Sequence, residues 1–372
     1  MANPFFLCYF ETTRRCMLSC PYCMTRLPAP SEVPELTTDE AKHLVLDEVR
    51  KFSSGAAVAF SGGEFLLRND AMELLRHNAA NGLWSFVNTC GVGVTRDVIV
   101  DMKAATGGRL TLVMSIDSLC SGNDAVTREG RLPAVEQAVS HCDELDVSHF
   151  FVVTVSKSNL HELGDVIAYA TRHNTPVLRS PMVPRGGGAA YRHLMFDRED
   201  MEQIIHPILR ETWLSYISFT PFMAAPKFFQ KNWLHAKIAI RQLGCQAGRG
   251  YVGVSAEGDV APCVHLLDSE VVCGNVRKTP LSEILKSSEV LQRLRRRELK
   301  GKCGRCKYRE TCGGCRALAY YHHGDYLAED PTCFYEPDDA AASEHEPILN
   351  ENVGTFARFI SETRPWKDIF NP

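Results

Sequence analysis

The stretch Cys16-Met17-Leu18-Ser19-Cys20-Pro21-Tyr22-Cys23 decides how this chain is interpreted, and an apolar run at residues 5–10 precedes it. Its cysteines have the spacing C-x3-C-x2-C. Three thiolates can bind three irons of a 4Fe-4S cluster and leave the fourth iron open to another ligand. A structural zinc site needs a fourth protein ligand, and bacterial ferredoxins use a C-x2-C-x2-C-x3-C run. No nearby Cys or His completes this loop, so the stretch favours a three-cysteine cluster.

Outward from this stretch, short β-like runs alternate with helical patterns as far as about residue 185, which is typical of a parallel α/β fold. Six β/α units predict a partial (β/α)6 TIM-like barrel, which carries its chemistry at the C-terminal strand ends. The cysteine loop and the segments 61–64 and 115–117 all fall there. Strands are predicted at 5–10, 56–60, 84–88, 110–116, 149–155 and 176–180, and helices at 38–52, 70–81, 96–104, 132–144 and 160–173.

Composition excludes several classes of protein. The 372 residues are 45% apolar, enough for a large core, and the net charge of -4 is spread along the chain, which gives no reason to expect nucleic acid. No apolar run approaches the roughly 20 residues of a membrane span, and residues 5–10 are too short and aromatic for a signal peptide. Fifteen cysteines, eleven of them in two clusters, indicate metal binding rather than disulfides. We therefore expect a cytoplasmic protein.

Two motifs resemble the radical S-adenosylmethionine (SAM) superfamily. Tyr22 stands immediately before the third cysteine, where that family commonly has an aromatic residue. Ser61-Gly62-Gly63-Glu64 follows an apolar strand and resembles the family's GGE motif. The resemblance implies that the open iron chelates the amino and carboxylate groups of SAM, and that Gly62, Gly63 and Glu64 hold the amino group.

Further polar residues near strand ends are similar to positions that contact SAM in this family. The resemblance implies that Asn88, Ser115 and Asp117 contact its ribose or carboxylate, and that Arg128 pairs with its carboxylate. Strand-end caps for the first three, and a solvated arginine for the last, are the alternatives. The chain has Asn123-Asp124 before Arg128, where relatives carry His-Asp.

The C-terminal third contains a second group of cysteines, which resembles the SPASM auxiliary-cluster domain. It departs from the common pattern because only Gly313 and Gly314 separate Cys312 from Cys315. The resemblance implies one 4Fe-4S cluster on Cys303, Cys306, Cys312 and Cys333. It implies a second on Cys245, Cys263 and Cys315, with Cys273 or the substrate as a further ligand. A pair of zinc knuckles is the alternative.

Histidines near these cysteines are weaker candidates for function. His265, two residues after Cys263, is a candidate acid/base group, with a core-satisfied histidine as the alternative. His322 and His323 are similar. The basic run 293–297 predicts a solvated helix face, and residues 185–188 predict a loop. The four remaining cysteines predict small apolar core residues: Cys8, Cys90, Cys120 and Cys142.

Changes in composition predict four segments. Residues 1–190 form the barrel, 191–243 a helical and aromatic connection, 244–337 the cysteine-rich domain, and 338–372 an acidic tail. Only 15 residues precede Cys16, which leaves no room for the leader-binding domain of many peptide-modifying relatives. Such a domain could be a separate protein.

The resemblance implies an enzyme that reductively cleaves SAM, with a flavodoxin- or ferredoxin-type electron donor, to a 5'-deoxyadenosyl radical that abstracts a substrate hydrogen. Modification of a peptide or protein side chain ranks first. Side-chain chemistry on a haem-type tetrapyrrole follows closely, because residues 312–317, 324–331 and 34–38 resemble that branch. Small natural products rank third, and an iron-sulfur electron carrier is the non-enzymatic alternative.

Overall fold

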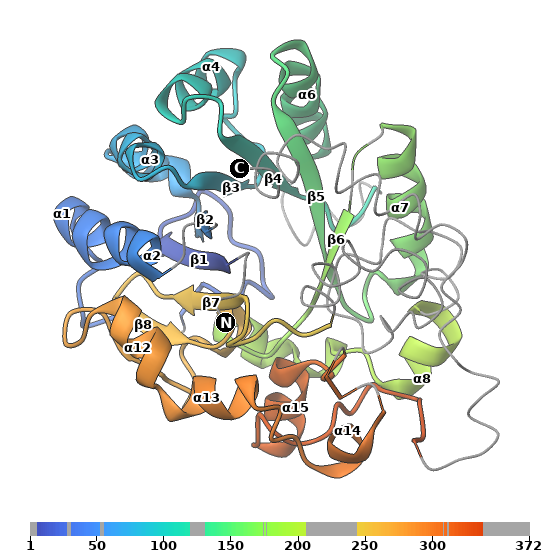
Figure 1. Ribbon diagram of the computed structural model, residues 1–372. Coiled ribbons are helices and arrows are strands. Elements are labelled where there is room, and N and C mark those ends of the chain that lie inside the picture. Colours follow the sequence, from blue (N-terminus) through green and yellow to red (C-terminus); the bar gives the residue numbers. More distant parts are fainter. Residues whose placement is uncertain are drawn as a thin grey trace, which may run out of the picture.

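The computed structural model of the 372-residue chain describes residues 6–27, 31–52, 56–119, 131–173, 175, 177–205, 244–307, 309–310 and 312–337. Within these residues, nine strands form one open sheet in the order β6-β5-β4-β3-β2-β1-β7-β8-β9. Figure 1 shows this sheet curving into an open barrel, with the helices α3, α4, α6 and α7 on its outer side. The predicted tail lies outside the described residues, as does most of the aromatic connection.

Six parallel strands make the barrel wall, and each pairs with the next along the chain. Their apolar side chains are buried because the helices cover the outer face and side chains fill the inner one. β2 is buried over six of its seven residues. The strands are β1 (Phe6–Thr13), β2 (Ala56–Gly62), β3 (Trp84–Thr89), β4 (Leu110–Ser115), β5 (Ser148–Val155) and β6 (Val177–Pro181).

The first helix of the barrel begins where the sequence places its cap. Thr37 and Glu40 form a capping box, since the Thr37 side chain accepts from the Glu40 N–H and Glu40 accepts from the Thr37 N–H. The helix predicted over 38–52 is continuous but passes through a π-helical segment, η1 (Ala41–Leu46). The helices are α1 (Thr38–Glu40), α2 (Asp47–Phe52), α3 (Ala71–Ala80), α4 (Arg96–Ala105), α6 (Arg131–Glu144) and α7 (Leu163–Arg172).

The C-terminal segment extends the same sheet. β7 (Tyr251–Val254) pairs in parallel with β1, on the edge opposite β2, and β8 (Asp259–Ala261) and β9 (Gly274–Asn275) continue it in antiparallel pairs. Figure 1 shows the helices that follow β9 along the lower part of the molecule. They are α12 (Leu281–Ser287), α13 (Glu289–Arg295), α14 (Gly301–Arg305) and α15 (Arg316–His323).

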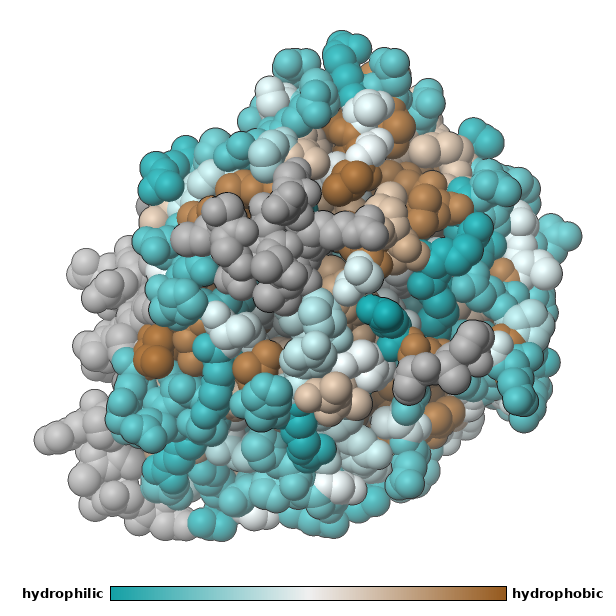
Figure 2. Space-filling view, turned by 180° about the vertical axis from the view of Figure 1, so that it is seen from behind, coloured by the Kyte–Doolittle hydropathy of each residue, from teal (hydrophilic) through white to brown (hydrophobic). Residues whose placement is uncertain are grey.

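The predicted open (β/α)6 barrel with a C-terminal cysteine-rich module is confirmed, whereas the four segment boundaries stay predictions. The loop predicted at residues 185–188 is wrong, because a 3-10 helix runs over Gly186–Leu194 before α8 (Arg198–Asp200). Figure 2 shows a mostly hydrophilic rim, as expected for the exposed faces of amphipathic helices. No helix within the ranges given above is long and apolar enough to cross a membrane.

Candidate active site at the carboxyl ends of the strands

The first cysteine loop leaves the carboxyl end of β1 and folds back on itself. The Cys23 N–H donates to the Cys20 carbonyl at 3.2 Å, and the Leu18 N–H donates to Cys16 Sγ at 3.3 Å. Burial raises the pKa of Cys20 to about 11, and the charges of Cys23 and Cys16 contribute. Cys16 is exposed, whereas Cys20 and Cys23 are half-buried. The three thiols therefore lie close enough for their charges to interact, and Cys16 is open to solvent.

The Gly62-Gly63 pair fits this loop because neither residue has a side chain. A Cβ on Gly62 would lie 2.2 Å from the Thr13 carbonyl oxygen, and its φ of +121° favours glycine as well. A Cβ on Gly63 would lie 2.1 Å from the Arg15 carbonyl oxygen. Instead, the Gly63 N–H donates to the Thr13 carbonyl at 2.7 Å. The glycines thus bring the end of β2 against the chain leading into the cysteine loop.

Glu64 extends this motif into a buried position with one oxygen satisfied. Its Oε2 accepts from the Cys90 N–H at 2.9 Å and from the Thr89 hydroxyl at 3.1 Å. Its Oε1 is buried and has no hydrogen-bond partner. Burial raises the pKa of Glu64. An unpaired buried charge is costly, so a cation that binds at Oε1 would stabilise this carboxylate.

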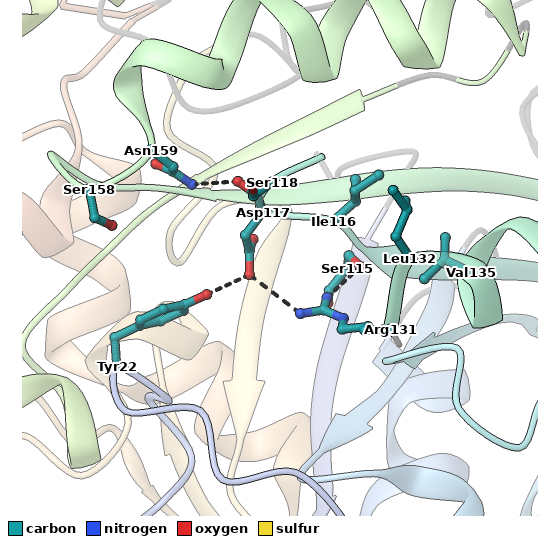
Figure 3. A pocket seen from close by; sticks show the side chains of 10 residues that line it. All are labelled: Tyr22, Ser115, Ile116, Asp117, Ser118, Arg131, Leu132, Val135, Ser158 and Asn159. Carbon is teal, nitrogen blue, oxygen red and sulfur yellow. Dashed lines mark hydrogen bonds and ion pairs between the residues drawn. The ribbon is translucent and has the colours of Figure 1, made fainter. Parts of the chain in front are cut away.

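A pocket of about 440 Å³, including its open mouth, lies beside the loop at the ends of β4 and β5. Figure 3 shows Tyr22, Asp117 and Arg131 converging in it. The Tyr22 hydroxyl donates to Asp117 Oδ2 at 2.8 Å, and the Thr154 N–H donates to Asp117 Oδ1 at 2.7 Å. Ser115 also lines the pocket. The structure thus brings Tyr22, Ser115 and Asp117 together around one pocket, and their contacts with SAM stay a prediction.

Arg131, which sequence reasoning missed, supplies the cation of this pocket. Its guanidinium donates to the Ser115 carbonyl and stands 3.8 Å from Asp117 Oδ2. Arg128, the arginine named from the sequence, lies outside the described residues. Arg131 is the first residue of α6. In the sequence, the sign that could have indicated it is a basic residue at the start of a helix that follows a strand end. Asn88 does not line this pocket and donates to the Phe60 carbonyl at 3.3 Å.

The three consecutive glycines after β6 pack on the backbone of the cysteine loop. The Gly187 N–H donates to the Cys23 carbonyl at 3.0 Å. A Cβ on Gly186 would lie 2.5 Å from the Met24 carbonyl oxygen, and one on Gly187 would lie 2.8 Å from that of Pro21. These segments lie far apart in sequence, so the glycines hold the loop against β6.

Replacing Gly187 by Ala is therefore expected to destabilise the protein by about 1–3 kcal/mol, because rigid backbone atoms would have to move. The midpoint of anaerobic thermal unfolding measures this loss. Gly164→Ala is the matched control, since a Cβ there meets nothing within 4 Å and α7 would gain a better helix former. An equal midpoint of thermal unfolding for the two variants would contradict the role of these glycines in holding the cysteine loop.

A buried ion network ties the ends of β1 and β6 to the C-terminal module. Both Glu11 oxygens accept from Arg185, at 2.7 and 2.8 Å, and Arg185 also bonds Asp268. Arg14 bridges Asp268 and Glu257 with bonds of 2.8–3.0 Å. The residues come from positions 11 to 268, so folding must place the two modules together before these charges are satisfied.

In the C-terminal module, Cys245, Cys263 and Cys315 form one electrostatic group. Burial raises the pKa of Cys315 well above its ordinary value, and the charges of Asp330, Cys245 and Cys263 act in the same direction. Burial also raises the pKa of Cys263 to about 12, with a contribution from Cys245. Metal binding deprotonates such thiols. The group matches the second ligand set that the resemblance implies, although its role stays a prediction.

Cys303, Cys312 and Cys333 form a separate group. Burial raises the pKa of Cys312, and the charges of Cys333 and Cys303 raise it further. Cys306, at the end of α14, is half-buried. Asp330 stands between the two groups, because it accepts from the Cys315 N–H at 2.6 Å and its own N–H lies 3.4 Å from Cys303 Sγ.

Two arginines lie against Gly313 and Gly314. These glycines are the two residues that make the spacing between Cys312 and Cys315 differ from the common SPASM pattern. A Cβ on Gly313 would lie 2.0 Å from Arg297 Nη1, and one on Gly314 would lie 2.6 Å from Arg316 Nη2. The solvated face predicted for 293–297 is wrong for Arg297, which is 2% exposed. Its Nε and Nη1 are buried without hydrogen-bond partners, close to Cys245 and Cys312. A buried guanidinium of this kind fits an anionic, thiolate-bound cluster nearby.

Cys273 lies in different surroundings from these two groups. Burial raises its pKa to about 12, and Ser288 and Arg295 are the neighbours that lower it. Its ligand role stays a prediction. Three other cysteines, Cys8, Cys90 and Cys142, are buried as the sequence predicts, and Cys120 lies outside the described residues.

His265 is buried beside the Cys263 group. Its Nε2 lies 2.9 Å from Ser180 Oγ, and its Nδ1 lies 3.4 Å from Cys263 Sγ. Burial lowers its pKa to about 4, with a contribution from Arg185, so the imidazole is neutral at pH 7. It does not line the pocket of Figure 3. His322 and His323 end α15, and His322 has a pKa lowered by partial burial. Catalytic roles for these histidines stay predictions.

Comparisons with known proteins agree with this arrangement. Residues 10–170 match the model of the Radical SAM superfamily, and residues 245–316 match SPASM, an iron-sulfur cluster-binding domain. The chain is 35% identical to the AdoMet-dependent heme synthase of Methanosarcina barkeri, over 91% of this chain and 98% of that protein. It is 28% identical to the PqqA peptide cyclase of Rhodopseudomonas palustris, over 88% and 86%.

The fold has a solved counterpart as well. The structure of anSMEcpe with bound AdoMet superposes with a TM-score of 0.65 at 18% identity, covering 95% of this chain and 99% of that one. The family-model matches contain the first cysteine loop, the Gly62-Gly63-Glu64 motif and the second cysteine region from Cys245 to Cys315, whereas Cys333 lies beyond them. The chain therefore belongs to the radical SAM superfamily and is an enzyme of the branch that carries a C-terminal SPASM domain.

Proposed function

We propose that this enzyme uses radical SAM chemistry for the oxidative or decarboxylative modification of a side chain on a haem-type tetrapyrrole. The observation that carries the proposal is the 35% identity to an AdoMet-dependent heme synthase along almost the whole of both chains. The sequence ranks peptide modification slightly ahead because that class is broader. We now place the tetrapyrrole first, since the peptide cyclase is the more distant relative.

The residues of the first site fit a SAM-binding 4Fe-4S cluster. Cys16, Cys20 and Cys23 would hold three irons, and the unpartnered Oε1 of Glu64 suits the amino group of SAM. Arg131 suits its carboxylate. When bound, this cluster and SAM supply reductive cleavage to a 5'-deoxyadenosyl radical, for which we propose a flavodoxin- or ferredoxin-type electron donor in the cytoplasm.

The chain's own residues position and shield the reactants. Asp117 holds Tyr22 in the wall of the pocket through the 2.8 Å hydrogen bond, which fixes the ring beside the cysteine loop. The glycines at 186–188 fix the cysteine loop. In the C-terminal module, Asp330, Arg297 and Arg316 organise the two cysteine groups, which would hold one or two auxiliary 4Fe-4S clusters.

Replacing Glu64 by Gln is expected to weaken SAM binding about 10–100-fold, because a charge-assisted bond to a buried carboxylate contributes about 1.5–3 kcal/mol. Equilibrium binding of SAM to the anaerobically reconstituted enzyme measures this change. Glu73→Gln is the matched control, since Glu73 lies on α3 with a side chain 51% exposed. Unchanged affinity in Glu64→Gln would exclude the carboxylate from SAM recognition.

The substrate is tested by supplying the reconstituted, reduced enzyme with SAM and an iron tetrapyrrole deuterated in its side chains. Deuterium in 5'-deoxyadenosine, together with a tetrapyrrole of changed mass, is the expected result. Formation of 5'-deoxyadenosine without deuterium transfer would contradict the tetrapyrrole proposal. A parallel reaction with deuterated precursor peptide and a separate leader-binding protein tests the alternative that the peptide cyclase relative favours.

A further inference from the structure

A second group of metal-ligating side chains lies on the outer wall of the barrel, between α2 and α3, and contains no cysteine. It consists of His43 in η1, Asp47 at the start of α2, and His77 in the last turn of α3. Figure 1 shows these helices side by side on the outside of the sheet. One nitrogen or oxygen from each residue lies within 4.8 Å of the others.

The carboxylate of Asp47 lies between the two imidazoles. Its Oδ2 is 2.9 Å from His43 Nδ1, and its Oδ1 is 2.6 Å from His77 Nε2. Asn81 donates to Oδ1 at 2.8 Å and thereby orients the carboxylate. The group therefore brings one carboxylate oxygen and two imidazole nitrogens together.

The local backbone brings these residues together. The Asp47 N–H donates to the Lys42 carbonyl, five residues back, as in a π-helix, and π-helical turns are frequent at functional sites. The neighbouring Lys42 pairs with Glu73, so its charge is neutralised. His43 has a side chain 62% exposed, whereas those of Asp47 and His77 are 28% and 25% exposed. A metal ion can thus enter from solvent without rearrangement of the helices.

We propose that His43, Asp47 and His77 bind one divalent first-row transition metal of the zinc type, with water completing the coordination. Two imidazoles and a carboxylate form a ligand set that zinc accepts, at bond lengths of about 2.0–2.2 Å. Asn81 acts as the second-shell partner that fixes Asp47. The bound ion would join α2 to α3 and stabilise the barrel wall.

The test is a calorimetric titration of zinc into the anaerobically reconstituted holoenzyme, with cluster absorbance recorded throughout. The wild-type protein is expected to bind one more zinc ion per chain than His43→Ala or His77→Ala. Asn81→Ala is expected to weaken binding at this site about 10-fold or more. A crystal exposed to zinc should show an anomalous peak between the three side chains at the zinc edge.

The matched control is His173→Ala, because His173 is an exposed histidine beyond the end of α7. Its zinc stoichiometry should equal that of the wild type. If a histidine variant folds poorly, the isosteric Asp47→Asn variant provides the same comparison. Equal stoichiometry in wild type, His77→Ala and Asp47→Asn would overturn the proposal, as would an anomalous peak found only at the cysteines.

Discussion

A variant with Cys16, Cys20 and Cys23 all replaced by Ala is expected to produce no 5'-deoxyadenosine and to lose the iron of one 4Fe-4S cluster. The three thiols are neighbours at the carboxyl end of β1, and no other cysteine lies in this loop. Anaerobic reconstitution, iron and sulfide determination and chromatography of the SAM products measure the two losses. The auxiliary cysteine groups should retain their own iron, because they lie in the C-terminal module.

Cys142→Ala is the control for this variant. Cys142 is a fully buried core residue of α6, so its replacement removes a thiol without touching either cysteine region. It should leave iron content and SAM cleavage at the wild-type level. Residual SAM cleavage by the triple variant would contradict the assignment of these three cysteines as cluster ligands.

The ligand role of Cys273 is tested in the same way. A Cys273→Ala variant that keeps its full iron content would exclude Cys273 as a cluster ligand.

Replacing Arg185 by Met is expected to cost about 3–5 kcal/mol of folding stability, because it leaves the buried carboxylate of Glu11 without its principal counter-ion. The side chains of Arg185 and Glu11 are 1% and 0% exposed. Asp268 and the Val264 carbonyl lose bonds as well. Thermal and urea unfolding of the reconstituted protein, followed by circular dichroism, measure the change.

The double variant Glu11→Gln with Arg185→Met should recover part of this loss, since no charge then remains buried alone. Arg198→Met is the control for the loss of an ordinary ion pair. Arg198 and Glu336 are 49% and 42% exposed, so their pair contributes at most about 1 kcal/mol. Equal destabilisation by Arg185→Met and Arg198→Met would show that burial does not increase the contribution of the Arg185 ion network to folding stability.

Much of the barrel could be predicted from local patterns. The runs at 56–60 and 84–88 begin at the same residues as β2 and β3, because buried parallel strands are short, continuous apolar segments. The start of α1 follows from Thr37 and Glu40, whose capping box depends on residues three apart. What the pattern could not show was the π-helical turn of η1, since its hydrogen-bond register leaves no mark in apolar periodicity.

The candidate site also contains some residues that the sequence could predict and others that it could not. Cys16, Cys20, Cys23 and the Gly62-Gly63-Glu64 motif could be named from the sequence, because each lies within one short loop with a recognisable spacing. Arg131 and Asp330 could not, since their roles depend on partners from other elements: Asp117 for Arg131 and Cys303 for Asp330. Arg297 was misjudged because a run of basic residues gives no sign of which side chain is buried.

The sequence by itself determined the three-cysteine loop, the alternation of strands and helices, and the presence of a second cysteine region. All of these depend on residues close together in the chain. Only the tertiary structure decided that β7 joins the barrel sheet along β1, that the glycines at 186–188 hold the first loop, and that Glu11, Arg185 and Asp268 share one buried network. These contacts join residues as far apart as Leu7 and Tyr251, which are 244 positions apart in the chain, and long-range packing and charge pairing leave no local pattern to read.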